Sequence, residues 1–322
     1  MKTENPISSE TSTQPQPAAA APSNAHWRGR SVLITGATGF IGRNLAQILT
    51  REGVAVHALT RNAAGAQQLL AGGQCTLHPY DGSLGCIIAA VTQAQPDLVI
   101  HLATSYHVSH DAQALEDMLE ANIAFGARLL QAIDQVQPAT GRLLSASTSF
   151  QHFENQAYSP VSFYAATKQA FDDLALYFCQ ARDMRWLKLE LSDTYGPDDH
   201  RGKLFSLFEK AANAATPVPM SPGEQMLDLL HVDDVVEGFL TAGQRVLGES
   251  FVRSQAWALR SGHPLSLRQV AAVYADARGQ SLNIDWGAQP YRPRTPMTVP
   301  DCTPVLPGWK PQYTLQEGIA KM

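Results

Sequence analysis

The chain has 322 residues, of which 44% are hydrophobic and 16% are charged. This length and composition allow one large domain or two closely associated ones, and they exclude a collagen-like chain or one that is disordered throughout. The formal net charge of −5 leaves no overall basic field, so we do not expect nucleic acid as a partner.

The first 29 residues are rich in Ser, Thr, Pro, Gln and Ala. A segment with so few large apolar groups cannot offset its ordering entropy, so we expect a disordered tail. It lacks the basic and then apolar pattern of a secretory signal, and the sequence has no uncharged apolar run of about 20 residues. We therefore expect a cytoplasmic protein without a membrane partner.

From residue 30 onward, short apolar runs alternate with segments of helical periodicity. We predict strands at 31–35, 54–59, 74–78, 97–102, 142–145 and 186–191, and helices at 40–52, 87–95, 114–136 and 164–182. This alternation predicts an α/β fold, a Rossmann-type doubly wound parallel sheet with helices on both faces.

The C-terminal third is rich in proline and has few clean strands. In a doubly wound fold such late segments build a cap over the carboxyl ends of the strands. We therefore assign residues 30–192 and 228–258 to a nucleotide-binding domain, and residues 193–227 and 259–322 to a smaller substrate-binding cap.

A glycine-rich turn, with Gly36, Gly39 and Gly42, follows the first strand and opens the first helix. Glycines there permit a tight turn, close approach of the backbone to a pyrophosphate, and close packing of helix against strand. The helix N-terminus adds unpaired N–H groups and the positive end of its dipole. We predict a dinucleotide site at this turn, with further contacts from Thr38, Phe40 and Ile41.

The second strand ends without the acidic residue that a fold selective for NAD usually carries. Arg61 stands at this point, and its guanidinium matches the geometry of a 2′-phosphate. The alternative is that Arg61 is a solvated loop residue. The sequence therefore favours NADP as the cofactor, with NAD possible.

The glycine turn and several later segments resemble the extended short-chain dehydrogenase/reductase superfamily, in its NAD(P)-dependent nucleotide-sugar epimerase/dehydratase branch. The matching segments, in order, are TGATGFIG, PDLVIHLA, ANIAFGARLL, TYGPDD, DLLHVDDVVEGF and PGWKPQYTLQEGI, and they extend from about residue 30 to the end. The resemblance implies that Asp81 contacts the adenine, although an Asp in a turn can equally be a turn former. It also implies further residues around the nicotinamide and the substrate: a structural Asn122 beside the cofactor, Leu102, Ala103 and Thr104 along the nicotinamide, and Ser105 next to the substrate.

Tyr164 and Lys168 form the only YxxxK pair of the sequence. This spacing puts both side chains on one face of a helix, where the ammonium favours the phenolate. The tyrosine can then act as general acid or base toward a carbonyl or an alcohol, and the resemblance implies that Lys168 also holds the nicotinamide ribose. The third catalytic member is expected at the end of the preceding strand. Register with the family favours Ser147, with Thr148 as the alternative.

The sequence departs from the family pattern just after this strand. Sugar dehydratases of the family carry an Asp–Glu pair there, which removes a proton and expels water. Here the corresponding positions are Thr148 and Ser149, or Ser149 and Phe150. We therefore do not expect 4,6-dehydratase activity, and we assign Thr148 and Ser149 to substrate binding.

Two further departures from the family pattern affect how a diphosphate would be bound. Leu227 stands where many epimerases of the family carry an Arg, and Asp193 replaces an Asn. The diphosphate must then be held elsewhere. The candidate substrate contacts are Asp193, Lys203 and Arg292, with Arg294 as a further possible cation.

We expect no metal site. His101, His107 and His110 lack a nearby Cys or carboxylate ligand set. The four cysteines form no CxxC pair, so free thiols are expected.

Taken together, these motifs predict an NADP-dependent ketoreductase that reduces a 4-keto-6-deoxy nucleotide sugar, with Tyr164 as the general acid. Segments such as YAATKQAFDDL look most like the 4-ketoreductases of the CDP-abequose and CDP-paratose synthase type. The alternatives are an NAD-dependent nucleotide-sugar 4-epimerase, a reductase of a non-sugar carbonyl, and a non-catalytic NADP-binding protein. Since the long helices form a four-helix bundle in many relatives, a homodimer is expected.

Overall fold

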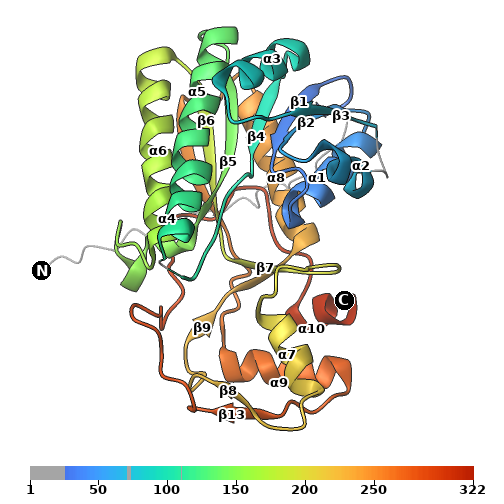
Figure 1. Cartoon of the computed structure of the whole chain (residues 1–322), viewed down its shortest axis with the longest axis vertical. Helices are drawn as coiled ribbons and strands as arrows, with labels where there is room; N and C mark the ends of the chain where they lie inside the picture. Colours follow the sequence, from blue (N-terminus) through green and yellow to red (C-terminus); the bar gives the residue numbers. More distant parts are fainter. Residues whose placement is uncertain (1–25, 71–73, 110) are drawn as a thin grey trace, which may run out of the picture.

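The computed structural model describes residues 26–70, 74–109 and 111–322, and a seven-stranded parallel sheet forms its centre (Figure 1). In spatial order the strands are β11 (Ser254–Leu259), β6 (Arg185–Leu191), β5 (Arg142–Thr148), β4 (Leu98–His101), β1 (Ser31–Thr35), β2 (Ala55–Thr60) and β3 (Cys75–Pro79). The direction of winding reverses between β1 and β4. Doubly wound sheets bind their ligands at the carboxyl ends of the strands beside such a switch point.

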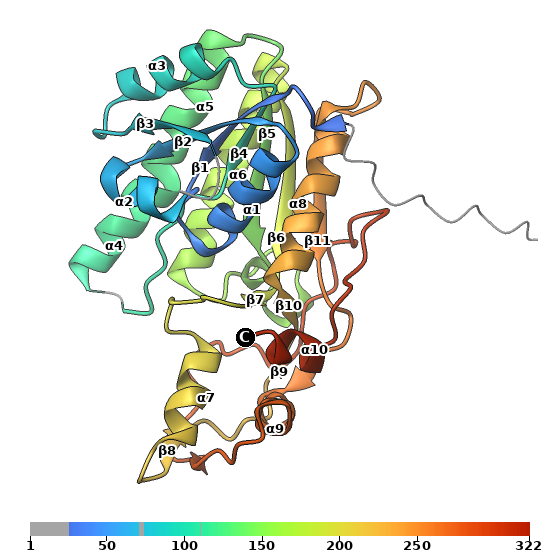
Figure 2. The same ribbon diagram turned by 90° about the vertical axis from the view of Figure 1, so that its right-hand side faces the viewer.

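Helices cover both faces of the sheet (Figure 2). One face carries α1 (Phe40–Arg51) and α8 (Val232–Leu247), and the other carries α3 (Leu84–Ala94), α5 (Phe125–Val136) and α6 (Phe163–Arg182). Successive side chains of a strand point to opposite faces, so Ile34 packs in the core under α1 and α8 while Leu33 packs under α3 and α5. The Rossmann-type fold predicted from the sequence is confirmed.

Every strand predicted from the sequence is present, with end points shifted by up to a few residues. The prediction missed β11, α8 and the short α2 (Ala63–Leu69). The helix predicted at 114–136 consists of α4 (Ala112–Leu119) and α5, joined by a π-helical turn over Glu120–Ala124. This turn becomes important at the active site.

A smaller layer lies below the carboxyl ends of the strands (Figure 1). Its elements are α7 (Leu204–Ala212), β8 (Val218–Met220), β9 (Met226–Leu227), β12 (Leu265–Ser266), α9 (Leu267–Arg278), β13 (Ile284–Trp286) and α10 (Leu315–Ala320). Phe205, Phe208, Val270 and Tyr274 form a separate apolar core in this layer. The pair β7 (Asp193–Tyr195) and β10 (Leu229–His231) connects the layer to the sheet.

Two stretches that the sequence assigned elsewhere belong to the core of the main sheet. Trp27 is fully buried and packs in that core, so the expected tail is corrected at its C-terminal end, while residues 1–25 lie outside the described residues. Leu306 and Trp309, predicted as part of the cap, pack in the same core. The indole of Trp309 donates to the backbone oxygen of Asp234 on α8 at 2.9 Å. In the sequence, Trp27 and Trp309 are bulky aromatic residues among polar neighbours, which is a local sign that these segments pack against the sheet.

Within the described part of the chain, no helix combines the length and apolarity needed to cross a bilayer.

Candidate active site

The glycine turn between β1 and α1 leaves no room for side chains. Gly36 has a φ of +73°, and a Cβ on it would lie 2.6 Å from the backbone nitrogen of Ala103. A Cβ on Gly42 would collide with the carbonyl oxygen of Gly36. Gly39 begins α1 without a side-chain cap, and the first turn of α1 carries no acidic residue. The Gly39 N–H donates to the Gly36 oxygen at 3.0 Å, while the N–H groups of the first turn of α1 are available for an anion. This helix start fits the pyrophosphate of a dinucleotide.

The other residues predicted around this turn differ in exposure. Thr38 and Ile41 are half-buried beside the glycines. Phe40 is buried in the sheet core, so any contact it makes with a pyrophosphate runs through its backbone.

Two guanidinium groups flank the same turn. Arg201 lies 4.3 Å and Arg43 5.6 Å from the centre of the Phe40 ring. Arg201 is also held by Asp199 and donates to the backbone oxygen of Thr194 at 2.9 Å. The sequence prediction missed Arg201, because its place depends on the segment after β7 folding back onto α1.

Arg61 and Asp81 follow β2 and β3 at the carboxyl edge of the sheet. Arg61 is exposed and forms no hydrogen bond or ion pair with another described residue. Asp81 is exposed and accepts from the backbone N–H of Ser83 at 2.8 Å. Hydrogen bonds from Ser83 and then Cys86 lower the pKa of Asp81 to about 2. Asp81 thus builds its own turn, and its expected contact with the adenine stays a prediction.

The side chain of Asn122 links the loop after β4 to α6 through hydrogen bonds. The Oδ1 atom of Asn122 accepts from Thr104 Oγ1 at 2.9 Å and from the Ser105 N–H at 2.8 Å. Its Nδ2 atom donates to the Ser105 oxygen and to Thr167 Oγ1, both at 2.9 Å. Asn122 lies in the π-helical turn, which widens the helix locally and aims this side chain at the loop. Since all its hydrogen-bonding capacity is used, Asn122 positions the loop rather than touching a cofactor.

Leu102 and Ala103 form the start of this loop. The Leu102 N–H donates to the Thr35 oxygen at 3.0 Å, and the Ala103 N–H donates to the Thr35 hydroxyl at 3.3 Å. The same hydroxyl contacts His101 Nδ1 at 2.7 Å. Both residues are half-buried beside Gly36, next to the position expected for the cofactor.

Tyr164 and Lys168 lie in the first two turns of α6, which Ser162 caps. Tyr164 is half-buried, and its ring meets that of Tyr106 edge-on at 5.1 Å. Burial raises the pKa of Tyr164 to about 12, and a hydrogen bond with Thr104 opposes this rise. In the protein without cofactor, the net shift of the Tyr164 pKa is thus upward, and the phenol carries its proton at neutral pH.

Lys168 is only 3% exposed. Its ammonium lies 5.7 Å from the centre of the Phe171 ring and forms no hydrogen bond or ion pair with any described residue. Burial lowers the pKa of Lys168 to about 8, while the charge of Asp172 opposes this. An ammonium kept without a fixed partner is suited to hold the hydroxyls of a ribose, so the residues present fit a nicotinamide cofactor.

The three candidate hydroxyls at the end of β5 have different surroundings. Ser147 is 3% exposed, and its Oγ lies 2.8 Å from Gln151 Oε1 and 3.0 Å from Asp172 Oδ2. Thr148 is buried and accepts from the Phe150 N–H at 3.2 Å. Ser149 lines the cleft described next. The environment expected for Ser147, open to a substrate, is thus found at Ser149.

A cleft of about 390 Å³ separates the carboxyl ends of the strands from the smaller layer. Of the predicted substrate contacts, Ser149, Asp193 and Arg292 line it, and so does Leu227. Thr148, Ser105 and Lys203 do not belong to its lining. Phe150, Ser192 and Asp228 of the main domain also line it. The other walls come from the cap: Leu207, Pro219, Met220, Ser221, Gln225, Met226, Leu267, Gln289, Pro290, Tyr291, Thr295, Pro296, Thr298, Val299 and Pro300.

Two charged residues of the cleft lining, Asp193 and Arg292, act on Tyr106. Burial first, and then the carboxylate of Asp193, raise the pKa of Tyr106, while Arg292 lowers it. Lys203 Nζ lies 3.7 Å from Asp193 Oδ1, so Lys203 acts on the cleft through its ion pair with Asp193. Arg294 donates to the backbone oxygen of Pro160 at 2.9 Å, outside the cleft.

The next residues are the histidines that the sequence analysis weighed as metal ligands. His101 is buried with its Nδ1 on Thr35, and burial together with Lys168 lowers its pKa to about 3. His107 lies 3.5 Å from Asp117, and His110 lies outside the described residues. No group of three or more possible metal ligands occurs in the part of the chain that the structure describes.

A model of the NAD dependent epimerase/dehydratase family matches residues 32–252. The chain belongs to this family. It is thus an enzyme of the oxidoreductase and epimerase type that uses a nicotinamide cofactor. The preference between NAD and NADP is a separate matter.

Several relatives match this chain over most of its length. CDP-abequose synthase of Salmonella typhimurium is 26% identical over 90% of this chain and 96% of its own. A dTDP-glucose 4,6-dehydratase of Xanthomonas campestris is 26% identical over 89% of this chain and 90% of its own. Among solved structures, MoeE5 in complex with UDP-glucuronic acid and NAD has a TM-score of 0.75 and 25% identity, covering 91% of this chain and 97% of its own.

Proposed function

We propose that the enzyme is an NADP-dependent ketoreductase that reduces the 4-keto group of a 4-keto-6-deoxy nucleotide sugar. The observation that carries this proposal is the Tyr164–Lys168 pair on one face of α6, with Asp193 of the cleft lining close enough for its charge to act on Tyr164. The coverage by CDP-abequose synthases, which extends over nearly the whole chain, supports a reductase of this class.

Tyr164 carries the proton that the proposed reduction consumes. A phenol whose pKa is raised to about 12 is a proton donor at neutral pH, which reduction of a carbonyl needs. Oxidation of an alcohol would need the phenolate first. The reduced cofactor, when bound, supplies a hydride to the carbonyl carbon. Tyr164 then gives its proton to the carbonyl oxygen, and Lys168 orients the ribose.

We assign the third hydroxyl to Ser149 rather than Ser147. Asp172, which holds Ser147, lies eight residues beyond Tyr164, or about 12 Å further along the helix axis. Ser149 is two residues nearer to the carboxyl edge and lines the cleft with Asp193, whose charge acts on Tyr164.

The variant pair Ser149→Ala and Ser147→Ala tests this assignment. We expect Ser149→Ala to lower kcat/KM by about 10²-fold, since one donor to a developing oxyanion has about this effect. Ser147→Ala should lower the midpoint of thermal unfolding and leave kcat within about threefold, because it removes a buried hydrogen bond. A larger loss of kcat in Ser147→Ala would restore the first expectation.

NADP is favoured by Arg61, which is exposed at the end of β2 and has no partner among the described residues. Arg61→Ala should weaken NADPH binding by about 10- to 100-fold, the equivalent of one charged hydrogen bond, and leave NADH binding unchanged. Fluorescence titration measures both constants. Arg51→Ala, an exposed arginine at the end of α1, is the matched control. Equal loss for both nucleotides would rule out a 2′-phosphate contact.

A 4-epimerase using NAD is the second candidate, because solved neighbours bind UDP-sugars together with NAD. The two candidates differ in their cofactor. A reductase exchanges NADPH freely, whereas an epimerase keeps its nucleotide through the cycle. Nucleotide released from denatured purified protein, combined with NADPH and NADH titrations, distinguishes them. Tightly held NAD would place the epimerase first.

A further inference from the structure

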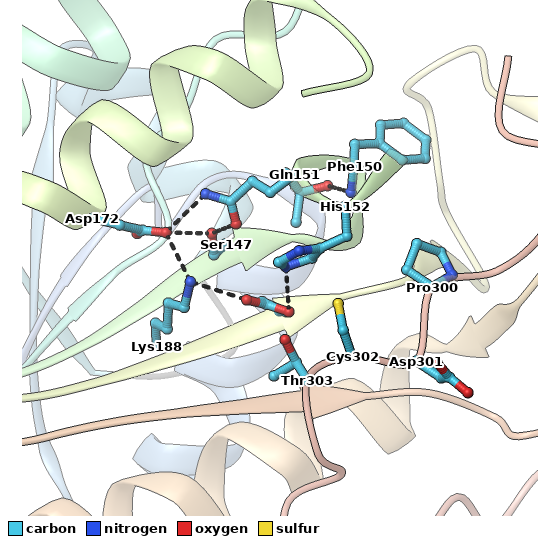
Figure 3. Close-up of polar contacts among 12 residues, drawn as sticks. Ser147, Phe150, Gln151, His152, Asp172, Lys188, Pro300, Asp301, Cys302 and Thr303 are labelled. Atoms are coloured by element: carbon cyan, nitrogen blue, oxygen red, sulfur yellow. Dashed lines mark hydrogen bonds and ion pairs between the residues drawn. The ribbon is translucent and has the colours of Figure 1, made fainter. Parts of the chain in front are cut away.

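Four titratable side chains, Asp172 on α6, Lys188 and Glu190 on β6, and His152, are buried side by side (Figure 3). Lys188 Nζ lies 3.3 Å from Asp172 Oδ2 and 3.0 Å from Glu190 Oε1, and His152 Nε2 lies 3.2 Å from Glu190 Oε2. These side chains are between 3% and 15% exposed. Replacing a buried ion pair by apolar residues is often neutral or stabilising, so the cluster calls for a reason besides stability.

The two oxygens of Asp172 are used unequally. Oδ2 is within hydrogen-bond distance of Ser147 Oγ at 3.0 Å, Gln151 Nε2 at 2.9 Å and Lys188 Nζ at 3.3 Å. Oδ1 is buried and has no hydrogen-bond partner among the described residues. A buried carboxylate oxygen left without a donor is costly, so a group beyond the described contacts must face it.

Lys168 is the unpartnered donor on the same helix. Tyr164, Lys168 and Asp172 recur at intervals of four residues and therefore form one stripe along α6. Lys168 is as buried as Asp172, and its ammonium lacks a hydrogen-bond partner among the described residues. A carboxylate oxygen without a donor and an ammonium without a hydrogen-bond partner among the described residues thus lie four residues apart on the same helix.

We propose that Asp172 is the counter-ion of Lys168, with one bound water joining its free Oδ1 to the Lys168 ammonium. Ser147, Gln151 and Lys188 hold the other oxygen and fix the carboxylate in place. Asp172 is thereby a positioning residue for the catalytic pair. The proposal rests on the function proposed above only through the role given to Lys168.

The groups around Lys168 determine the pKa of its ammonium. His101 on β4 faces it in the neutral form, since burial and Lys168 lower the pKa of His101 to about 3. Tyr164 and Asp172 flank it on α6, and Lys188 and Glu190 on β6 lie behind Asp172. Burial lowers the pKa of Lys168 to about 8, and Asp172 opposes this lowering. Without the Asp172 charge, the ammonium loses its proton at a lower pH.

The test follows the titration of Lys168 by NMR in the full chain without cofactor, labelled with [ε-13C]lysine and assigned through Lys168→Met. In Asp172→Asn we expect the Lys168 pKa to fall by about one unit or more. Asp172→Glu should restore most of the wild-type value. Asp173→Asn is the matched control: this carboxylate is exposed on the same helix and accepts a hydrogen bond from Gln169, so the Lys168 pKa should stay unchanged.

A second variant, expected to shift the Lys168 pKa in the opposite direction, tests the proposal if Asp172→Asn does not fold. Lys188→Gln removes the cation that competes for Asp172, so the Lys168 pKa should rise. The alkaline limb of the kcat–pH profile should move with the NMR value in each variant. An Lys168 pKa in Asp172→Asn equal to that of Asp173→Asn would overturn the proposal. Because the NMR readout needs no substrate, a shifted pKa in an enzyme that reduces no keto sugar would sink the proposed function alone.

Discussion

Tyr164→Phe should lower kcat by about 10²- to 10⁴-fold, the range found for a positioned general acid. The ring, its contact with Tyr106 and the backbone of α6 stay in place, so only the proton donor is lost. NADPH affinity should therefore change by no more than about twofold, since the phenol does not hold the nucleotide. Single-turnover oxidation of NADPH, followed by absorbance, separates the two quantities.

Tyr177→Phe provides the matched control for this variant. Tyr177 lies on the same helix, is 56% exposed and contacts the neighbouring Phe178 ring. It should retain the wild-type rate. If Tyr164→Phe kept more than about a tenth of the wild-type kcat, another group would have to donate the proton.

Gly42→Ala should weaken binding of the nicotinamide cofactor by about 100-fold. Its Cβ would collide with the Gly36 carbonyl and approach Ala37 Cα to 2.8 Å, so the glycine turn must move. Overpacking of this kind costs about 1–3 kcal/mol, and 100-fold corresponds to about 2.7 kcal/mol. Isothermal titration with NADPH measures the effect.

Gly85→Ala is the control for that substitution. Gly85 is exposed in the first turn of α3, and its Cβ would meet nothing closer than Ser83 Oγ at 3.8 Å. An alanine there should leave cofactor binding unchanged and stabilise the helix slightly. Equal cofactor affinities in the two variants would mean that the glycine turn does not cradle the pyrophosphate.

The local motifs of this site were readable from the sequence because each lies within one stretch of chain. The glycine turn follows its strand directly, and Tyr164 and Lys168 share one face of α6, so spacing alone predicts both. The same spacing continues to Asp172, and Lys188 and Glu190 alternate with three leucines in the second half of β6. These charges were a visible sign of the buried cluster that the prediction did not use.

Features that depend on distant contacts were not predictable in this way. The choice among Ser147, Thr148 and Ser149 depends on where β5 ends relative to α6, and a shift of one residue turns a side chain to the other face. Trp27 becomes part of the core only because it packs beside Gly243 of α8. Most of the cleft wall comes from several cap segments that no single motif connects.

Deuterium transfer tests the proposed reaction most directly. The purified enzyme is incubated with [4-2H]NADPH, carrying deuterium on the transferred face, and a 4-keto-6-deoxy nucleotide sugar. Our account predicts one deuteron on carbon 4 of the product for each NADPH oxidised, by NMR and mass spectrometry. Interconversion of UDP-hexose epimers with tightly held NAD, and no deuteron transferred to the keto sugar, would contradict it.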